Sequence, residues 1–218
     1  MLIVKEQFEI NQSVIGLYLG SFDPVHNAHV QIPVKIFSTY KFDRIIYIPT
    51  GLSPVGKKPH ISNSDRLKML ENALHQYKYL SISDYELKLK TICYSINTIK
   101  YFKKQYPQDK LRLIIGEDNF ESFEKWHKYS NIIDLLNIII LIRDNAKSCD
   151  NMRSLQEFIT DDINQFNESN SKMIHYFNGL KSNISSTMIR NKIRDNKPIE
   201  KYVLADNHKY ILEKKLYK

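Results

Sequence analysis

The sequence predicts an α/β fold, a doubly wound parallel sheet with a small C-terminal helical cap. Apolar segments with the spacing of buried strands alternate along the chain with segments of helical spacing, which is typical of parallel sheets. The longest apolar run, Ile138–Ile142, has the length of a strand and is far below the ~20 residues of a membrane span. We find no internal repeat or linker, so we expect a single domain over residues 1–218 with the cap at about 185–218.

The first 79 residues contain two expected strands and two expected helices. Val14–Leu19 predicts a buried first strand, Asn27–Tyr40 a helix, and Arg44–Ile48 a second strand. Pro49–Ile61 contains Pro, Gly and Lys and predicts an irregular loop. Ser62–Tyr79 predicts a helix that begins with a loose capping box and carries one apolar face.

The alternation continues from residue 81 onward and ends in two helices. The expected elements are a strand over Ser81–Leu89, a helix over Tyr94–Tyr106, strands over Leu111–Ile115 and Asn137–Ile142, a helix within Asp144–Asn170, a strand over Lys172–Phe177, and helices over Ser185–Arg194 and Pro198–Leu216. The last two helices form the expected cap.

The charge balance is basic, with 32 Lys+Arg against 24 Asp+Glu and a net charge of +8. Such a surface attracts polyanions, either a nucleic acid or small molecules rich in phosphate. The lysines are spread along the chain, so composition favours neither explanation. The N-terminal residues are too charged for a signal peptide, which favours a cytoplasmic protein. Cys93 and Cys149 form neither a metal pattern nor a disulfide framework.

The most informative segment is GSFDPVHNAH, which lies between the first expected strand and the first expected helix. Helix N-termini at the carboxyl ends of parallel strands offer N–H groups to phosphates, and Gly20 allows close approach of a ligand to the backbone. His26 and His29, three residues apart, can point to one side and donate to phosphate oxygens whose charge grows during transfer. The alternative is two surface histidines. A zinc site lacks a third ligand.

A second segment, ISSTMIR, precedes a basic helix. Ser185, Ser186 and Thr187 can cap that helix and still offer N–H groups and hydroxyls to a phosphate. Arg190 lies one turn further on, and its guanidinium can bind the same anion with bidentate geometry. Taken alone, the segment is equally compatible with an ordinary N-cap followed by an exposed arginine.

Both segments resemble motifs of the nucleotidyltransferase superfamily. GSFDPVHNAH resembles the signature that ends in His-x-Gly-His, and ISSTMIR is similar to the ISSTxxR element that grips the β- and γ-phosphates of ATP. The resemblance implies that His26 and His29 bind the triphosphate. Ala28 stands where the family usually has Gly, and Leu19 stands where the pyridine-nucleotide branch often has the first of two glycines.

Three further segments point to the nicotinate/nicotinamide mononucleotide adenylyltransferase family. IIGED resembles its G-x-D element, which maps the adenosine contacts to Gly116 and Asp118. Trp126 occurs at the spacing at which that family holds the pyridine ring, and an electron-rich ring suits such stacking. Tyr94 and Ser95 resemble a Tyr-Thr pair that borders the same pocket. A lone Trp in the core and an ordinary strand-to-helix turn are the structural alternatives.

The loop SPVGKKPH places Lys57 and Lys58 where they can act as cations over the site or remain solvated. Bacterial members typically carry Pro-Pro-His-Lys in this loop. The Ser-Pro-Val of this chain is closer to the eukaryotic branch, whose members accept the amide as well as the acid.

The resemblance implies a Rossmann-like fold and a nicotinate-nucleotide adenylyltransferase that makes deamido-NAD and pyrophosphate for NAD biosynthesis. Its substrates are ATP, which carries Mg²⁺, and a pyridine mononucleotide, with no protein-bound metal, specific nucleic acid or membrane. The implied site has His26, His29 and Arg190 in catalysis, Gly20, Ser21, Phe22, Gly116, Asp118, Ser185, Ser186 and Thr187 on ATP, and Tyr94, Ser95, Trp126, Lys57 and Lys58 on the pyridine nucleotide. The alternatives are nicotinamide mononucleotide as acceptor, a pantetheine-phosphate adenylyltransferase, and a basic nucleic-acid-binding protein.

Overall fold

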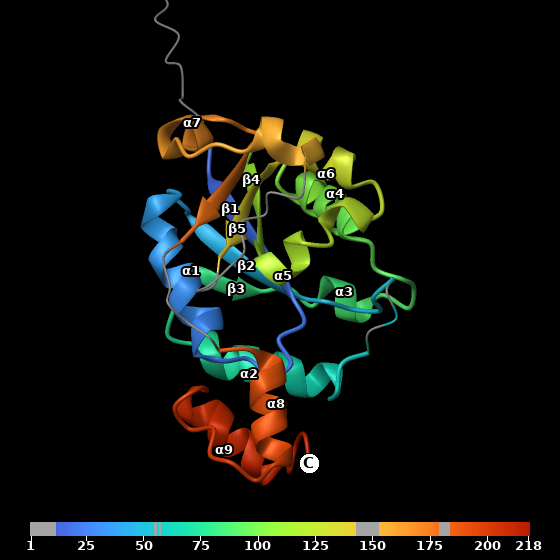
Figure 1. Ribbon diagram of the computed structural model, residues 1–218, viewed down its shortest axis with the longest axis vertical. Helices are drawn as coiled ribbons and strands as arrows, with labels where there is room; N and C mark the ends of the chain where they lie inside the picture. The colour runs from blue at the N-terminus through green and yellow to red at the C-terminus, as the bar shows by residue number, and fades with distance from the viewer. Residues whose placement is uncertain (1–11, 55, 57, 143–152, 179–183) are drawn as a thin grey trace, which may run out of the picture.

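The computed structural model describes residues 12–54, 56, 58–142, 153–178 and 184–218 (Figure 1). Within these residues, six parallel strands form one sheet in the order β3-β2-β1-β4-β5-β6. The strands are β1 Val14–Gly20, β2 Arg44–Pro49, β3 Leu80–Ile82, β4 Lys110–Gly116, β5 Asn137–Leu141 and β6 Ile174–Phe177. The predicted doubly wound α/β fold is confirmed.

Helices cover both faces of the sheet (Figure 1). The helices are α1 Asn27–Thr39, α2 Asn63–Leu74, α3 Tyr85–Lys88, α4 Ser95–Gln105, α5 Glu117–Phe120, α6 Tyr129–Leu135, α7 Ile163–Glu168, α8 Ser186–Arg194 and α9 Ala205–Glu213, with 3-10 turns η1 Phe123–Lys125 and η2 Arg153–Phe158. Helices α1 and α2 pack on one hydrophobic cluster, and α4 and α6 pack on the other. None of the described helices combines the length and hydropathy that a membrane crossing requires.

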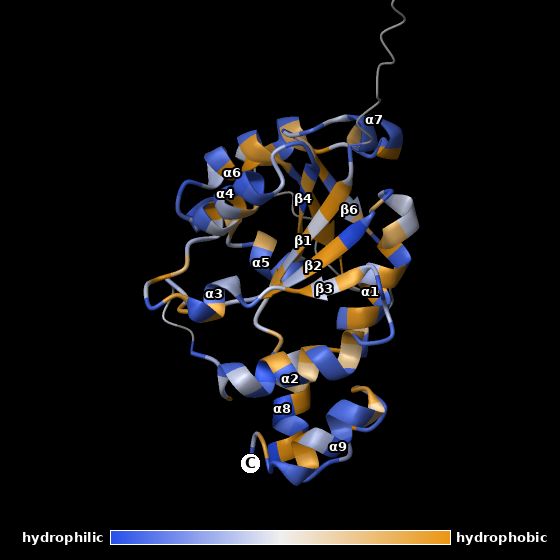
Figure 2. Ribbon diagram, turned by 180° about the vertical axis from the view of Figure 1, so that it is seen from behind, coloured by the Kyte–Doolittle hydropathy of each residue, from blue (hydrophilic) through white to orange (hydrophobic). Residues whose placement is uncertain are grey.

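Burial on both faces explains why the strands are continuous apolar runs. In β5, Ile138 and Ile140 belong to the cluster under α4 and α6, whereas Ile139 and Leu141 belong to the opposite cluster. Successive side chains of a strand alternate between the two faces, so each face needs its own apolar set. Figure 2 shows the same pattern, with hydrophobic strands inside and hydrophilic residues along the helices.

The predicted strand over Ser81–Leu89 is wrong beyond its first two residues. Only β3 is extended, and the following residues form the short helix α3. The buried Glu86 accepts hydrogen bonds from Thr98 Oγ1 at 2.6 Å and from the Gly51 N–H at 3.0 Å. These contacts are remote in sequence, so a local alternation of side chains could not reveal them.

Two predicted helices are longer than the helices in the structure. The helix predicted over Ser62–Tyr79 ends at Leu74 and continues as a turn. The helix predicted over Pro198–Leu216 is confined to α9, and the residues before it form a turn whose Tyr202 carbonyl accepts the Asn27 N–H at 2.9 Å. That bond attaches the C-terminal cap to the start of α1.

The single helix predicted within Asp144–Asn170 is replaced, in its described part, by η2 and α7. Residues 143–152 of that stretch lie outside the described residues. Asp162 caps α7 by accepting the N–H groups of Asn164 and Gln165, at 2.8 and 3.1 Å. A new N-cap inside the stretch starts a separate helix.

Candidate active site

The first motif lies at the point where the strand order of the sheet reverses. Gly20 ends β1 and Gly116 ends the neighbouring β4, and the register pairs Tyr18 with Ile114 two residues before them. Ligands of open α/β sheets bind in the crevice at such a switch point, outside the carboxyl ends of the strands. The topology therefore brings together two predicted ATP-binding segments that are far apart in sequence.

The two histidines stack on one another at the start of α1. Their ring centroids are 3.6 Å apart, with His26 buried as the N-cap and His29 half-buried. Nδ1 of His29 accepts the backbone N–H of His26 at 3.2 Å. A neutral His29 ring must therefore carry its proton on Nε2, so that Nε2 is the nitrogen that can donate to a phosphate oxygen.

Pro33 lies inside α1 and cannot donate to the carbonyl of His29, four residues earlier. The hydroxyl of Tyr47, a fully buried residue of β2, donates to that carbonyl at 2.7 Å. Tyr47 thus replaces the missing helical bond, in keeping with the rule that buried backbone groups find partners. Burial raises the pKa of Tyr47 well above its usual range, so its hydroxyl remains a donor.

Replacement of Tyr47 by Phe is expected to lower the free energy of unfolding by about 1–3 kcal/mol, because the His29 carbonyl loses its partner. In a Pro33→Ala background, the new backbone N–H can bond that carbonyl, and the same replacement should cost clearly less. Urea unfolding of the wild type, the two single variants and the double variant measures both effects. Equal losses in the two backgrounds would contradict this account.

The second motif is bonded directly to the first. The hydroxyl of Ser186, at the start of α8, donates to the Pro24 carbonyl at 2.9 Å. Nη1 of Arg190 donates to the Asp23 carbonyl at 2.6 Å. Ser186 and Pro24 are 162 residues apart in sequence, and their bond joins the two segments in one site.

The N-terminus of α8 carries hydroxyls and a guanidinium that can bind an anion. The Ser185 hydroxyl caps the helix by accepting the Met188 N–H at 3.1 Å. Thr187 is exposed, and its hydroxyl oxygen accepts Nη2 of Arg190 at 3.0 Å. The guanidinium is held in place by two bonds and retains further N–H groups with which it can bind a phosphate.

A buried arginine that the sequence analysis missed supports the first motif. Arg66 of α2 is fully buried and donates from Nη1 to the Ser21 carbonyl at 2.9 Å and from Nη2 to Asn63 Oδ1 at 2.7 Å. Burial lowers the pKa of Arg66, and the nearby Asp23 carboxylate opposes that shift. In sequence, Arg66 resembles an ordinary polar residue of an amphipathic helix, so nothing in the pattern indicated that it is buried beside the first motif.

The residues assigned to the pyridine ring also come together. Tyr94 caps α4, of which Ser95 is the first residue, and its ring lies 4.6 Å from that of His127. Trp126 is half-buried and packs against Phe123, with ring centroids 5.3 Å apart. His127 was missed by the sequence analysis, and its position directly after Trp126 is the signal that could have found it.

The loop after β2 connects this group with the phosphate motif. Its Thr50 N–H donates to the Gly20 carbonyl at 2.9 Å, and its Leu52 carbonyl accepts the Cys93 N–H at 2.8 Å, next to Tyr94. A Cβ at Gly51 would lie 2.4 Å from a backbone oxygen, so this close contact requires glycine. The loop therefore lies between the two halves of the site.

The remaining predicted residues differ in exposure. Phe22 is buried and packs edge-on against His29, whereas Ser21 and Asp118 are exposed. Lys58 is exposed on the loop after β2. Lys57 lies outside the described residues.

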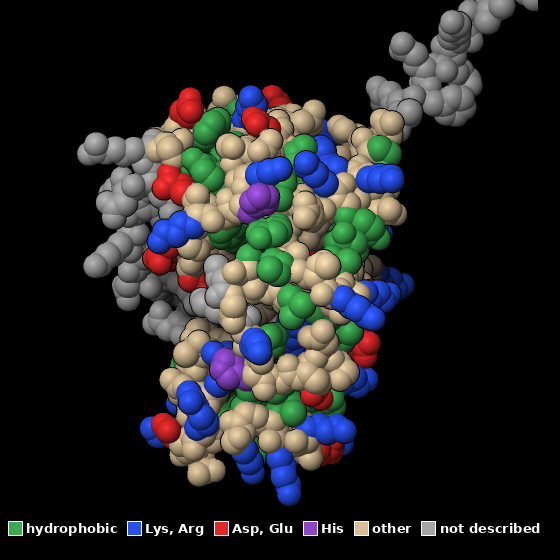
Figure 3. All heavy atoms as spheres, turned by 90° about the vertical axis from the view of Figure 1, so that its right-hand side faces the viewer, with side chains coloured by type: hydrophobic (Ala, Val, Ile, Leu, Met, Phe, Trp, Pro, Cys, Tyr) green, Lys and Arg blue, Asp and Glu red, His purple; other side chains and the backbone are tan. Residues whose placement is uncertain are grey.

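Basic residues do not gather into one patch on the face that Figure 3 shows, where Lys and Arg are scattered among polar and hydrophobic side chains. Among the described residues, no group of three or more His, Cys, Asp or Glu side chains could hold a metal ion.

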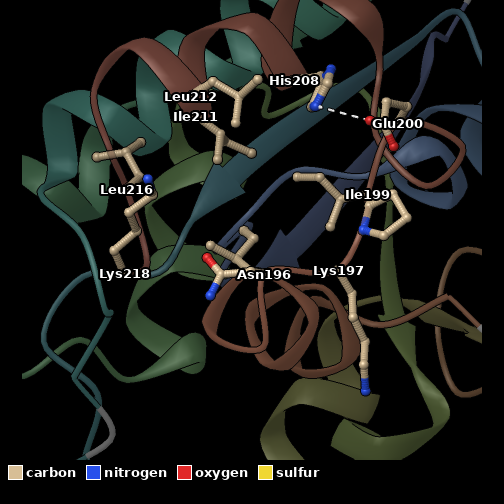
Figure 4. A pocket seen from close by; sticks show the side chains of 11 residues that line it. Asn196, Lys197, Ile199, Glu200, His208, Ile211, Leu212, Leu216 and Lys218 are labelled. Atoms are coloured by element: carbon tan, nitrogen blue, oxygen red, sulfur yellow. Dashed lines mark ion pairs between the residues drawn. The ribbon is translucent and has the colours of Figure 1, made fainter.

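A separate pocket of about 360 Å³ lies in the C-terminal cap (Figure 4). Its lining includes Ile199, Ile211 and Leu212, and the His208 ring lies 3.8 Å from the Glu200 carboxylate at its edge. None of the residues that line it belongs to either phosphate motif. The pocket is therefore distinct from the site built by His26, His29 and Arg190.

Comparisons with known proteins show which sequences and which fold this chain is similar to. The Cytidylyltransferase-like family matches residues 17–192. A "Probable nicotinate-nucleotide adenylyltransferase" of Clostridium botulinum (strain Okra / Type B1) is 31% identical over 96% of this chain and 100% of its own length. One of Aquifex aeolicus is 32% identical over 77% of this chain and 96% of its own length. The Plasmodium falciparum nicotinic acid mononucleotide adenylyltransferase complexed with NaAD superposes with a TM-score of 0.74 at 18% identity, covering 94% of this chain and 98% of that one.

Proposed function

The chain belongs to the Cytidylyltransferase-like family and, through its full-length relatives, to the nicotinate-nucleotide adenylyltransferases, and we propose that it joins nicotinate mononucleotide to the AMP part of ATP. The products are deamido-NAD and pyrophosphate, and the reaction serves NAD biosynthesis. The observation that carries this proposal is the direct bonding of the two phosphate motifs through Ser186 and Arg190.

The proposed reaction needs positioning and charge stabilisation rather than a covalent nucleophile. The phosphate of the mononucleotide attacks the α-phosphorus of ATP in line, and the bond to pyrophosphate breaks. His26 and His29 donate to the α-phosphate oxygens as their negative charge grows. Arg190 and the N-terminus of α8 bind the departing pyrophosphate.

Magnesium enters this proposal as part of the ATP substrate. The carboxylate of Asp23 is buried and bonded to His60 and Tyr217, and the other functional side chains that the two motifs bring together are imidazoles, hydroxyls and a guanidinium, which suit phosphate oxygens. Mg²⁺ prefers carboxylate, phosphate and water oxygens, so the phosphates of ATP are its expected ligands. Bound there, it neutralises part of the triphosphate charge.

The proposed acceptor pocket lies at Tyr94, Ser95 and Trp126. The half-buried indole offers a flat face to a pyridine ring, which is cationic in the mononucleotide. In this proposal the exposed Lys58 attracts the phosphate of the mononucleotide, and Lys57 stays a prediction of the sequence. Basic residues are scattered on the face that Figure 3 shows, and we expect DNA or RNA binding to be weak and salt-sensitive.

Nicotinate mononucleotide is expected to have the higher kcat/KM of the two pyridine mononucleotides at fixed Mg-ATP. A pocket for the acid needs only donors around the carboxylate, whereas a pocket for the amide needs an acceptor as well. Pyrophosphate release with each substrate measures the preference, with phosphopantetheine as a third acceptor that should give no release. A higher kcat/KM for the amide would overturn the choice of acceptor and leave adenylyl transfer standing.

A further inference from the structure

The buried carboxylate of Asp23 receives hydrogen bonds from two segments that are remote from it in sequence. Its Oδ1 accepts the Tyr217 hydroxyl at 2.8 Å. Its Oδ2 accepts the backbone N–H of His60 at 2.8 Å and lies 3.0 Å from Nδ1 of the same histidine. A buried carboxylate is unfavourable unless its oxygens are bonded, so these contacts determine how Asp23 is oriented.

The backbone beside this carboxylate holds the second phosphate motif. The Asp23 carbonyl accepts Nη1 of Arg190, and the Pro24 carbonyl accepts the Ser186 hydroxyl. A shift of the backbone at Asp23 would therefore move the acceptors that place α8 and its guanidinium. The carboxylate and the carbonyl of one residue thus connect Tyr217 to Arg190.

Tyr217 is itself held in a defined conformation. Its φ of 66° lies in the left-handed region, which a bulky residue adopts only where surrounding contacts hold it. Burial and the Asp23 carboxylate raise the pKa of Tyr217 far above that of an exposed tyrosine, against the opposing effect of Arg190 and Arg66. The hydroxyl therefore stays protonated and donates at neutral pH.

We propose that Tyr217 is a positioning residue of the phosphate site, which holds Arg190 in place by fixing Asp23. Its proposed effect is indirect and passes through Asp23 to Arg190. The inference rests on the proposed function, because that function assigns Arg190 to pyrophosphate. By this proposal, the hydroxyl of Tyr217 links the C-terminal cap to the residues that bind the departing pyrophosphate.

Replacement of Tyr217 by Phe removes the hydroxyl and keeps the ring. We expect the affinity for pyrophosphate, measured by calorimetry, and kcat/KM for ATP each to fall roughly tenfold, with KM for nicotinate mononucleotide unchanged. The matched control is Tyr210→Phe, which removes another tyrosine hydroxyl of the cap, bonded to Asp65 Oδ1 at 2.8 Å. The control should change both quantities by less than about twofold.

A double-variant cycle separates positioning from general destabilisation. In an Arg190→Lys background the oriented guanidinium is gone, so Tyr217→Phe should have little further effect on pyrophosphate affinity. A loss of the same size in both backgrounds, or an unchanged affinity in Tyr217→Phe with a wild-type melting curve, would overturn the proposal. Calorimetry requires no turnover, so a wild-type protein that binds pyrophosphate but makes no deamido-NAD would contradict the proposed function alone.

Discussion

Replacement of His26 or His29 by Ala is expected to lower kcat by roughly a hundredfold or more, because each loss removes a donor to the α-phosphate in the transition state. The stacking of the two rings at 3.6 Å and the bond from the His26 N–H to His29 Nδ1 place both imidazoles at the start of α1. Steady-state kinetics at saturating ATP and nicotinate mononucleotide measures the effect.

Two conservative variants sharpen this experiment at His29. The amide nitrogen of His29→Gln lies near the position of Nε2, whereas that of His29→Asn lies near Nδ1, so only the first should recover part of the lost kcat. His75→Ala, at an exposed position after α2, is the matched control and should behave as the wild type. A folded His26→Ala/His29→Ala protein with near-normal kcat would show that the two histidines take no part in the mechanism.

Replacement of Arg190 by Ala is expected to lower kcat/KM for ATP by about a hundredfold, since a charged donor to the leaving pyrophosphate is lost. Its guanidinium is held by the Asp23 carbonyl at 2.6 Å and by the Thr187 hydroxyl at 3.0 Å, so its geometry is fixed before ATP binds. Kinetics with ATP as the varied substrate, together with pyrophosphate inhibition, measures the loss.

Arg190→Lys keeps the positive charge and loses the planar guanidinium with its paired N–H donors. It should therefore be more active than Arg190→Ala and less active than the wild type. The control on the same helix is Arg194→Ala, an exposed arginine one turn further on whose Nη2 bonds Asn191 Oδ1. It should leave kcat/KM for ATP nearly unchanged. If Arg190→Ala and Arg194→Ala gave equal kinetics, Arg190 would have no special role at the phosphates.

Most strands and the two phosphate motifs could be predicted from the sequence, because their signals are local. The β1 and β5 segments are apolar runs bounded by turn residues, and Ser185 precedes α8 as a residue type that caps helices. Boundaries were less accurate where remote contacts decide them. The helix α3 replaces an expected strand because Glu86 is bonded to Thr98 and Gly51.

The residues that support the site were not predictable, because their roles depend on partners far along the chain. The sequence analysis gave Asp23 no role, and in the structure it is the acceptor that joins His60, Tyr217 and Arg190. In sequence, Tyr47 resembles any core residue of a strand. Its role follows from the structure, where its hydroxyl bonds the His29 carbonyl that Pro33 cannot reach with an N–H.

The sequence by itself determined the fold class and the chemistry of the two motifs. Periodicity, capping residues and side-chain types are properties of short stretches of the chain, so they can be recognised without the tertiary structure. Only the tertiary structure decided which of these groups meet. The parallel topology places Gly20 beside Gly116, and hydrogen bonds from α8 to the Asp23–Pro24 backbone join the two phosphate motifs. Such contacts depend on how the whole chain packs, because a buried donor or acceptor takes whichever partner the fold brings to it.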